Sequence, residues 1–323
     1  MDFLQSLPKI ELHAHLSGSV AISFLVELQD TSLSRKDFDD LYDYFPEVQS
    51  LLSSKKRLAE ALRIVLEDFR QDGVVYLELR SSPRVGKDYS KEEYIRIIAQ
   101  ILQDEARDLP LIAKLLISID RSKSIQDAKE NLDLFIRLSE EFPDTIVGLE
   151  VSGNPKKGDM KGILALIEEH RRVKHFRVSI HCGEEPHLSE IKDILAFKPD
   201  RIGHGVHVNP SDAPHIPWEV CLTSNIMSGS VPSYEEHVLK SLIQMGIPFS
   251  LCTDDSGLFR TNLSQEYEHM RTKVMPSASN AEIFKMSMRP IDFTFCDEAL
   301  RGKLKDFFKG WEIDNGDKYK LIG

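Results

Sequence analysis

The chain has 323 residues, a length that fits one large α/β barrel domain or two smaller domains. A composition of 41% hydrophobic and 29% charged residues is typical of a folded globular protein and excludes disordered and collagen-like chains. The 41 Lys and Arg against 52 Asp and Glu give a net charge of −11, so duplex nucleic acid and anionic membranes are not expected partners. Four cysteines without a C-x-x-C pair, no long apolar run and no signal-peptide pattern predict a cytoplasmic protein.

Short apolar segments alternate with longer segments of helical periodicity along the chain. The predicted strands are 8–13, 74–80, 111–119, 145–151, 175–181, 201–204, 218–223 and 247–253, and the clearest helices are 57–71, 91–107, 124–141 and 160–173. The stretches 28–58, 152–159, 209–217 and 228–236 are predicted loops. Eight such units without a G-x-G-x-x-G turn predict a closed (β/α)8 barrel, with residues 1–323 as a single domain.

Polar residues gather at the C-terminal ends of the predicted strands. In chain order they are His13 and His15, Arg80 and Arg84, Asp120, Gly153, His181 and Glu184, His204, Asn225, and Asp254 and Asp255. Barrel enzymes build their active sites at this end of the barrel. The distribution therefore predicts an enzyme with its site there.

The spacing of His13 and His15 suits a shared metal ion. Residues i and i+2 of a strand point to the same face, so both imidazoles can reach one point. A packed histidine would explain an isolated H-x-H more simply, but His181 and Asp254 end two further apolar strands, where a lone carboxylate is costly. Three imidazoles and one carboxylate, from strands one, five and eight, predict a Zn²⁺ site that also holds a water.

Two further residues lie near these predicted ligands. Glu184 follows His181 by three residues, and a partly desolvated carboxyl group beside a metal can keep its proton and act as a general acid. The alternative is a solvated acidic loop, which is our expectation for Glu185. His204 stands between two glycines that leave room for a ligand, so it is predicted to be a base or to orient a hydroxide.

The motifs together resemble a known family. L-P-K-I-E-L-H-A-H-L-S-G-S, S-G-N-P, H-C-G-E, D-R-I-G-H-G and C-T-D-D follow in this order across residues 7–255 and are similar to those of the adenosine deaminase family of zinc aminohydrolases. V-Y-L-E-L-R-S-S-P-R, C-L-T-S-N and T-D-D-S-G-L-F…L-S-Q-E-Y further resemble its adenosine deaminase-like branch, whose members act as N6-methyl-AMP deaminases. The H-x-E and P-C-x-x-C motifs of cytidine deaminases are absent.

This resemblance implies a role for each motif residue. One Zn²⁺ per chain would be held by His13, His15, His181 and Asp254, with His15 also near the substrate; Glu184 would donate a proton to purine N1, His204 would steer the attacking water, Asp255 would meet N7 and the backbone at Gly153 would meet N3. The implied reaction is hydroxide attack on purine C6, which converts N6-methyl-AMP to IMP and methylamine.

The residues expected near the 5′ position separate a nucleotide from a nucleoside. Nucleoside deaminases of the family carry H-x-H-L-D-G, whereas this chain has Ser17 in place of that aspartate. A carboxylate would repel a 5′-phosphate, while a hydroxyl can donate a hydrogen bond to it. The S-S-P-R motif supplies Ser81, Ser82, Pro83 and Arg84, whose guanidinium matches phosphate oxygens. Without the resemblance, Arg84 would be an ordinary surface arginine.

Several assignments and functions stay open at this point. Asp120 contacts substrate, caps a helix or pairs with Arg121, while Asn225 and Ser228 are predicted to line the pocket mouth. We expect a monomer that binds a small purine nucleotide and neither nucleic acid nor membrane. The alternatives are an adenosine deaminase acting on the free nucleoside, a metal-dependent hydrolase of another bond, and a binding or growth-factor-like protein that keeps the barrel.

Overall fold

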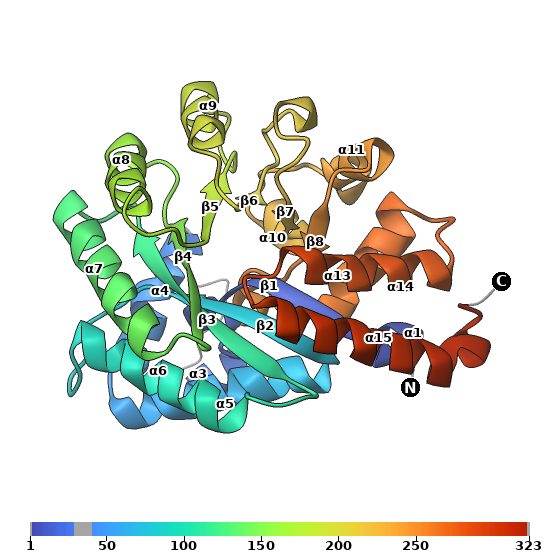
Figure 1. Ribbon diagram of the computed structural model, residues 1–323, viewed down its shortest axis with the longest axis horizontal. Helices are drawn as coiled ribbons and strands as arrows, with labels where there is room; N and C mark the ends of the chain where they lie inside the picture. The colour runs from blue at the N-terminus through green and yellow to red at the C-terminus, as the bar shows by residue number, and fades with distance from the viewer. Residues whose placement is uncertain (1, 29–40, 322–323) are drawn as a thin grey trace.

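The computed structural model describes residues 2–28 and 41–321, and within them eight parallel strands pair in sequence order (Figure 1). They are β1 (Lys9–His15), β2 (Val74–Ser81), β3 (Ile112–Asp120), β4 (Ile146–Ser152), β5 (Val178–Cys182), β6 (Arg201–His204), β7 (Trp218–Val220) and β8 (Phe249–Leu251). All eight predicted strands are confirmed. The arrangement is a (β/α)8 barrel, as the alternation in the sequence predicts.

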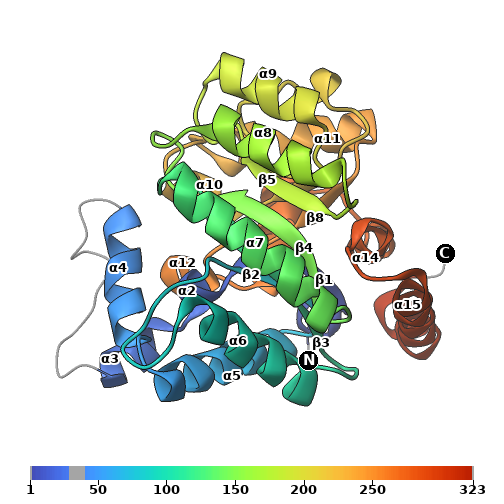
Figure 2. The same cartoon turned by 60° about the vertical axis from the view of Figure 1, so that its left-hand side comes forward.

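Helices cover the outside of the strands (Figures 1 and 2). The longer ones are α5 (Lys55–Gln71), α6 (Lys91–Glu105), α7 (Ile125–Glu141), α8 (Met160–Arg171), α9 (Leu188–Phe197), α14 (Asn280–Met288) and α15 (Glu298–Tyr319). Helices α5, α6 and α7 each begin after a serine whose hydroxyl accepts the N–H of the third helical residue, which explains where they start.

Shorter helices form the connections at the ends of the barrel. They are α1 (Phe3–Ser6), α2 (Leu16–Ser19), α3 (Ile22–Leu28), α4 (Leu41–Leu51), α10 (Leu222–Met227), α11 (Leu239–Met245), α12 (Ser256–Phe259) and α13 (Leu263–His269). Helix α1 contacts the end of α15, where Ser6 Oγ donates to Tyr319 Oη at 2.9 Å. No helix in the described ranges is both long and apolar enough to span a bilayer.

The prediction of a loop over 28–58 is wrong for the part that the structure describes. Residues 41–51 form α4 and α5 starts at Lys55, while 29–40 lie outside the described residues. Proline at position 46 suggested a turn, but Tyr44, Val48 and Leu51 repeat at helical spacing and are all buried. Their packing outweighs the hydrogen bond that Pro46 removes.

The barrel closes between its first and last strands, and this closure builds the site. Strand β1 continues through His15, so His13 and His15 lie within the strand rather than after it, as predicted. The His15 N–H donates to the Asp254 carbonyl at 2.9 Å, and the Asp254 N–H donates to the His13 carbonyl at 2.8 Å. Residues 241 positions apart in the chain, 13 and 254, therefore become neighbours.

The interior of the barrel is charged, in contrast to the branched apolar layers usual in this fold. The Arg201 guanidinium donates to both Glu78 and Glu219, and all three side chains are completely buried. Arg80 donates to Glu219 at 2.9 Å from the opposite side. Buried ions are costly unless they are paired and hydrogen-bonded, so these pairs fix one another's positions beneath the site.

Candidate active site

A cavity of about 330 Å³ opens at the C-terminal ends of the strands. Its lining contains twelve of the predicted site residues: His15, Ser17, Ser81, Ser82, Arg84, Asp120, Gly153, His181, Glu184, His204, Asp254 and Asp255. His13 lies completely buried beneath the cavity, and Pro83 is buried beside it in the chain. A second cavity of about 650 Å³, lined by Asp68, Asp72 and Arg260 among others, contains none of these residues.

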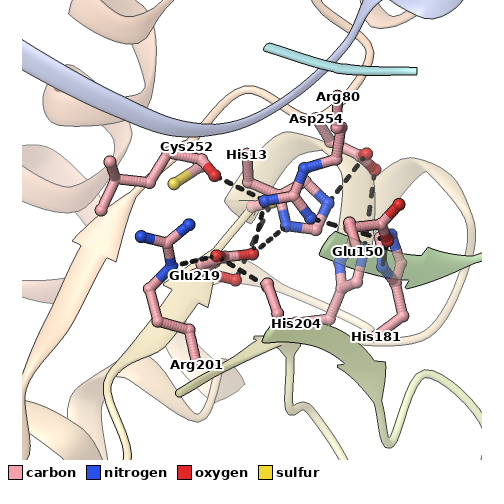
Figure 3. Close-up of polar contacts among 12 residues, drawn as sticks. His13, Arg80, Glu150, His181, Arg201, His204, Glu219, Cys252 and Asp254 are labelled. Atoms are coloured by element: carbon pink, nitrogen blue, oxygen red, sulfur yellow. Dashed lines mark hydrogen bonds and ion pairs between the residues drawn. The ribbon is translucent and has the colours of Figure 1, made fainter. Parts of the chain in front are cut away.

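Four side chains converge at the floor of the cavity (Figure 3). His15 Nε2 lies 3.3 Å from His181 Nε2 and 3.4 Å from Asp254 Oδ1, and His13 Nε2 lies 3.3 Å from the same Oδ1. At Zn–N distances of about 2.0–2.1 Å, tetrahedral ligand atoms are about 3.3 Å apart. The His13, His15, His181 and Asp254 atoms therefore have the separations that one zinc ion requires.

His204 is a competing member of this cluster. The ligand atoms of His13, His181, His204 and Asp254 all lie within 4.8 Å of one another, and all four side chains are buried. However, His204 Nε2 is 3.9 Å from the nearer Asp254 oxygen, which is longer than the three contacts of the other ligands. The distances favour His15 over His204 as the fourth ligand.

The metal-facing nitrogens are set by carboxylates from other strands, which sequence reasoning missed. His13 Nδ1 lies 2.7 Å from Glu219 Oε2 and His181 Nδ1 lies 2.8 Å from Glu150 Oε1 (Figure 3). Each contact turns Nε2 of the ring toward the cluster, as is usual for metal-binding histidines. The available signal was a glutamate inside an apolar strand, where an unpaired charge would be costly.

The electrostatics of the cluster suit a cation. Burial holds the pKa values of His15, His181 and His204 well below the usual range, so these rings are neutral near pH 7, as metal ligands must be. For His13, burial is outweighed by Asp254 and Glu219, which raise its pKa. His13 Nε2, which has no hydrogen-bond partner in the described chain, is therefore a point that favours positive charge.

Glu184 lies at the side of the cavity, 3.8 Å from His204 Nε2. Burial, followed by the nearby Asp254 charge, raises the pKa of Glu184 to about 8. The carboxyl group is therefore mostly protonated at neutral pH and can donate its proton. Glu185 instead forms an ion pair with Lys156 at 3.3 Å, as expected for a solvated loop residue.

The glycines beside His204 have a different purpose from the one predicted. A Cβ at Gly203 would lie 2.8 Å from His13 Cε1, and one at Gly205 would lie 2.4 Å from Trp218 Cε3. They make room for neighbouring rings and not for a ligand. His204 itself has φ of +59°, an uncommon conformation for a residue with a side chain.

Arg84 forms the other end of the cavity, together with hydroxyl groups. Its Nη2 donates to Ser17 Oγ and Tyr94 Oη, both at 2.8 Å, and to Ser81 Oγ at 3.4 Å. Its Nε and Nη1 are buried and have no hydrogen-bond partner among the described residues. These partners are all neutral, so the arrangement leaves a positive charge with two free N–H groups.

The remaining candidates have mixed outcomes. Asp120 lines the cavity and its Oδ1 accepts from the N–H and the hydroxyl of Ser122, which makes it a cap; the expected alternative of an ion pair is wrong, because Arg121 pairs with Glu190. Burial raises the pKa of Asp255 well above its usual range.

Two predicted features of the pocket mouth also separate. Ser228 lines the cavity as predicted. Asn225 does not: it is 1% exposed and lies behind His204, to which it is hydrogen-bonded. At Gly153, φ is +103° and a Cβ would meet Asp120 Oδ1 at 2.2 Å, so only glycine fits there.

Comparison with known proteins agrees with this geometry. The family model described as adenosine deaminase matches residues 8–311, so the chain belongs to the adenosine deaminase family. An adenosine deaminase-like protein of Drosophila melanogaster is 36% identical over 82% of this chain and 85% of its own length. The N6-mAMP deaminase of Arabidopsis thaliana is 32% identical over 95% and 98%. The solved structure of Arabidopsis ADAL complexed with IMP superposes with a TM-score of 0.87 at 31% identity, covering 99% of this chain and all of that one.

Proposed function

We propose that the chain is a zinc-dependent hydrolytic deaminase of N6-substituted purine 5′-monophosphates, which converts N6-methyl-AMP and water to IMP and methylamine. The observation that carries this choice is the Arg84 guanidinium, which is surrounded by hydroxyl groups and has two free N–H groups at one end of the cavity. The names of the relatives, an N6-mAMP deaminase and a protein complexed with IMP, support the same substrate class.

The metal in this proposal is one Zn²⁺ per chain, held by His13, His15, His181 and Asp254. The ligand separations of 3.3–3.4 Å and the neutral state of two of the imidazoles support it. Ser224 Oγ donates to Asp254 Oδ2 at 2.7 Å, which leaves Oδ1 for the metal. The chemistry that such a zinc supplies when bound is a more acidic water molecule, available as a nucleophile at neutral pH.

The protein side chains then supply the proton and the orientation of the purine. Glu184, protonated near neutral pH, donates to N1 and so makes C6 more electrophilic. Asp255, a buried carboxyl group with one unpartnered oxygen, faces N7, and the backbone at Gly153 faces N3. The water oxygen bonds to C6, the C6–N6 bond breaks, and methylamine leaves with the transferred proton.

At the other end of the cavity, Arg84 binds the 5′-phosphate with Ser17, Ser81 and Ser82. Arginine is suited to this task because its planar group donates to two phosphate oxygens at once. A phosphate would also provide the negative charge that the hydroxyl partners do not. The competing function, deamination of free adenosine, leaves the charge of Arg84 without a ligand group to bind.

Single-turnover assays of the zinc-loaded protein with N6-methyl-AMP, AMP and adenosine test the proposal. We expect N6-methyl-AMP to react fastest and adenosine to be slowest, because only the monophosphates engage Arg84. A preference for adenosine over both monophosphates would replace the proposal with the nucleoside alternative.

A further inference from the structure

A chain of buried hydrogen bonds connects His204 to the backbone of α11. The Leu239 N–H donates to His237 Nδ1 at 3.1 Å, His237 Nε2 lies 3.0 Å from Asn225 Oδ1, and Asn225 Nδ2 lies 2.9 Å from His204 Nδ1. The three side chains are 1–2% exposed. Neither Asn225 nor His237 lines the cavity, and no part of the proposed reaction uses them.

The direction of this chain follows from its backbone end. A backbone N–H can only donate, so His237 Nδ1 must carry a lone pair and the ring proton must be on Nε2. That proton points at Asn225, whose carbonyl oxygen accepts it. The Asn225 amide group then faces His204 and can only donate, so His204 Nδ1 carries a lone pair as well.

The reversed arrangement is disfavoured. Turning the Asn225 amide over would place its NH₂ against His237 Nε2, which would move the His237 proton to Nδ1, opposite the Leu239 N–H. Two buried donors would then face each other at 3.1 Å. A buried donor without an acceptor costs about 1–3 kcal/mol, so the observed direction is the stable one. Burial also lowers the pKa of His237 to about 4, which keeps this ring neutral.

We propose that Asn225 and His237 are positioning residues that hold His204 as the tautomer protonated on Nε2. This Nε2 is buried, lacks a hydrogen-bond partner in the described chain and lies 3.8 Å from Glu184 Oε1. His204 therefore presents an N–H donor to the cavity. It orients an oxygen atom that approaches purine C6, and it acts neither as a base nor as a fourth metal ligand, since both of these need a lone pair on Nε2.

The inference rests on the proposed deamination only for its kinetic consequence, because the tautomer is a property of the protein alone. The first experiment therefore uses no substrate. Imidazole ¹⁵N NMR of the zinc-loaded protein, with His204 assigned by loss of its signals in a His204→Gln variant, should show a proton on Nε2 and none on Nδ1. A proton on Nδ1 in the wild type would overturn the proposal.

The Asn225→Asp variant tests the last link. A carboxylate has the same shape as the amide but can only accept, so Nδ1 of His204 should gain a proton. Unchanged His204 nitrogen signals in a folded variant would show that Asn225 does not control the tautomer. Asn315→Asp, the same change on α15, is the control and should leave the His204 signals unchanged.

Kinetics of two substitutions at His237 separate positioning from packing. His237→Phe removes both hydrogen bonds and should lower kcat on the order of 10-fold or more with the best of the three test substrates, with little change in KM or zinc content. His237→Gln keeps an N–H donor near the position of Nε2 and should restore most of the rate. Equal losses in both variants, in step with their melting temperatures, would reduce His237 to a structural role. These outcomes hold whichever substrate proves best, so they are independent of the substrate proposal.

Discussion

The two ends of the cavity are built in different ways. At the metal end, His13, His181 and Asp254 are nearly or completely buried, and each is oriented by a side chain from a different segment. At the phosphate end, Ser17, Ser82 and Arg84 lie beyond the strand ends, and the partners of Arg84 are neutral hydroxyls. The chemistry is thus fixed by the barrel itself, while selection of the substrate depends on a few residues in connections.

This difference makes a testable division of labour. Substitutions at the metal end should abolish the reaction of every substrate, because they remove the metal or the proton donor. Substitutions at the phosphate end should change the ratio of nucleotide to nucleoside and leave the chemical step intact. A residue at one end with the effect expected of the other end would break the division.

The largest effect is expected for Asp254→Ala. It removes the oxygen that lies 3.3 and 3.4 Å from two imidazole nitrogens, so the variant should lose bound zinc and all measurable turnover of both nucleotide and nucleoside. Elemental analysis of the purified protein measures the metal directly. Asp212→Ala, a change in the short turn η2 (Pro210–Asp212), should keep about one zinc per chain. Full zinc content in the Asp254 variant would contradict the ligand assignment.

Next in size is Glu184→Gln, which removes only the proton donor. Zinc should be retained while kcat falls by about 10²–10⁴-fold for every substrate, the range that a general acid contributes. The neighbouring Glu185→Gln, which breaks only the ion pair with Lys156, should leave kcat within about twofold. A Glu184 variant with near-normal kcat would remove the acid role from this residue.

At the phosphate end, Arg84→Ala should cost about 2–5 kcal/mol in kcat/KM for N6-methyl-AMP, as expected when one member of a desolvated charge pair is removed. Adenosine should react almost as in the wild type. Arg84→Lys keeps the charge but loses the planar donor group, so its effect should be intermediate. Equal losses for nucleotide and nucleoside would show that Arg84 does not bind phosphate.

Ser17→Asp should produce a smaller shift of the same kind. The new carboxylate would take the place of the hydroxyl 2.8 Å from Arg84 Nη2, so it would both neutralise the arginine and repel the phosphate. We expect kcat/KM for N6-methyl-AMP to fall by about 10- to 100-fold, on the order of 1–3 kcal/mol, while that of adenosine is unchanged or rises. Ser17→Asn adds no charge and should keep nucleotide preference.

The same contrast explains which parts of the site could be predicted from the sequence. His13, His15, His181, Glu184 and Asp254 stand at or beside the ends of apolar strands, where a polar residue needs a reason to be present. The eight strands were equally visible, because their apolar runs are separated by helical periodicity. Strand ends were less certain: β1 extends two residues past its predicted end, because its pairing with Asp254 satisfies that backbone.

The supporting residues could not be assigned to partners in this way. Glu219 is visible as a charge inside a strand, but its contact with His13 spans 206 residues and depends on barrel closure. His237 gave no signal at all, since its role comes from one backbone N–H at the start of α11. Asn225 was recognised as a candidate, but was placed at the pocket mouth because a sequence does not show which way a short helix faces.

The smallest predicted effect concerns the cost of keeping Glu184 protonated. Its pKa is about 8 in the folded protein and about 4.5 when unfolded, so between these values the unfolded chain releases a proton that the folded chain holds. The stability that this group contributes is therefore fully present below about pH 4.5 and is lost as the pH rises through about 8. Glu184→Gln does not titrate. In metal-free protein, the stability of the variant relative to the wild type should rise by about 1–2 kcal/mol between pH 5 and pH 8.5, a value reduced for the partial exposure of the side chain. Urea unfolding at both pH values measures this difference. Glu185→Gln should give nearly the same difference from wild type at both, and a flat result for Glu184→Gln would show that the acid end of the cavity is not strained by its buried carboxyl group.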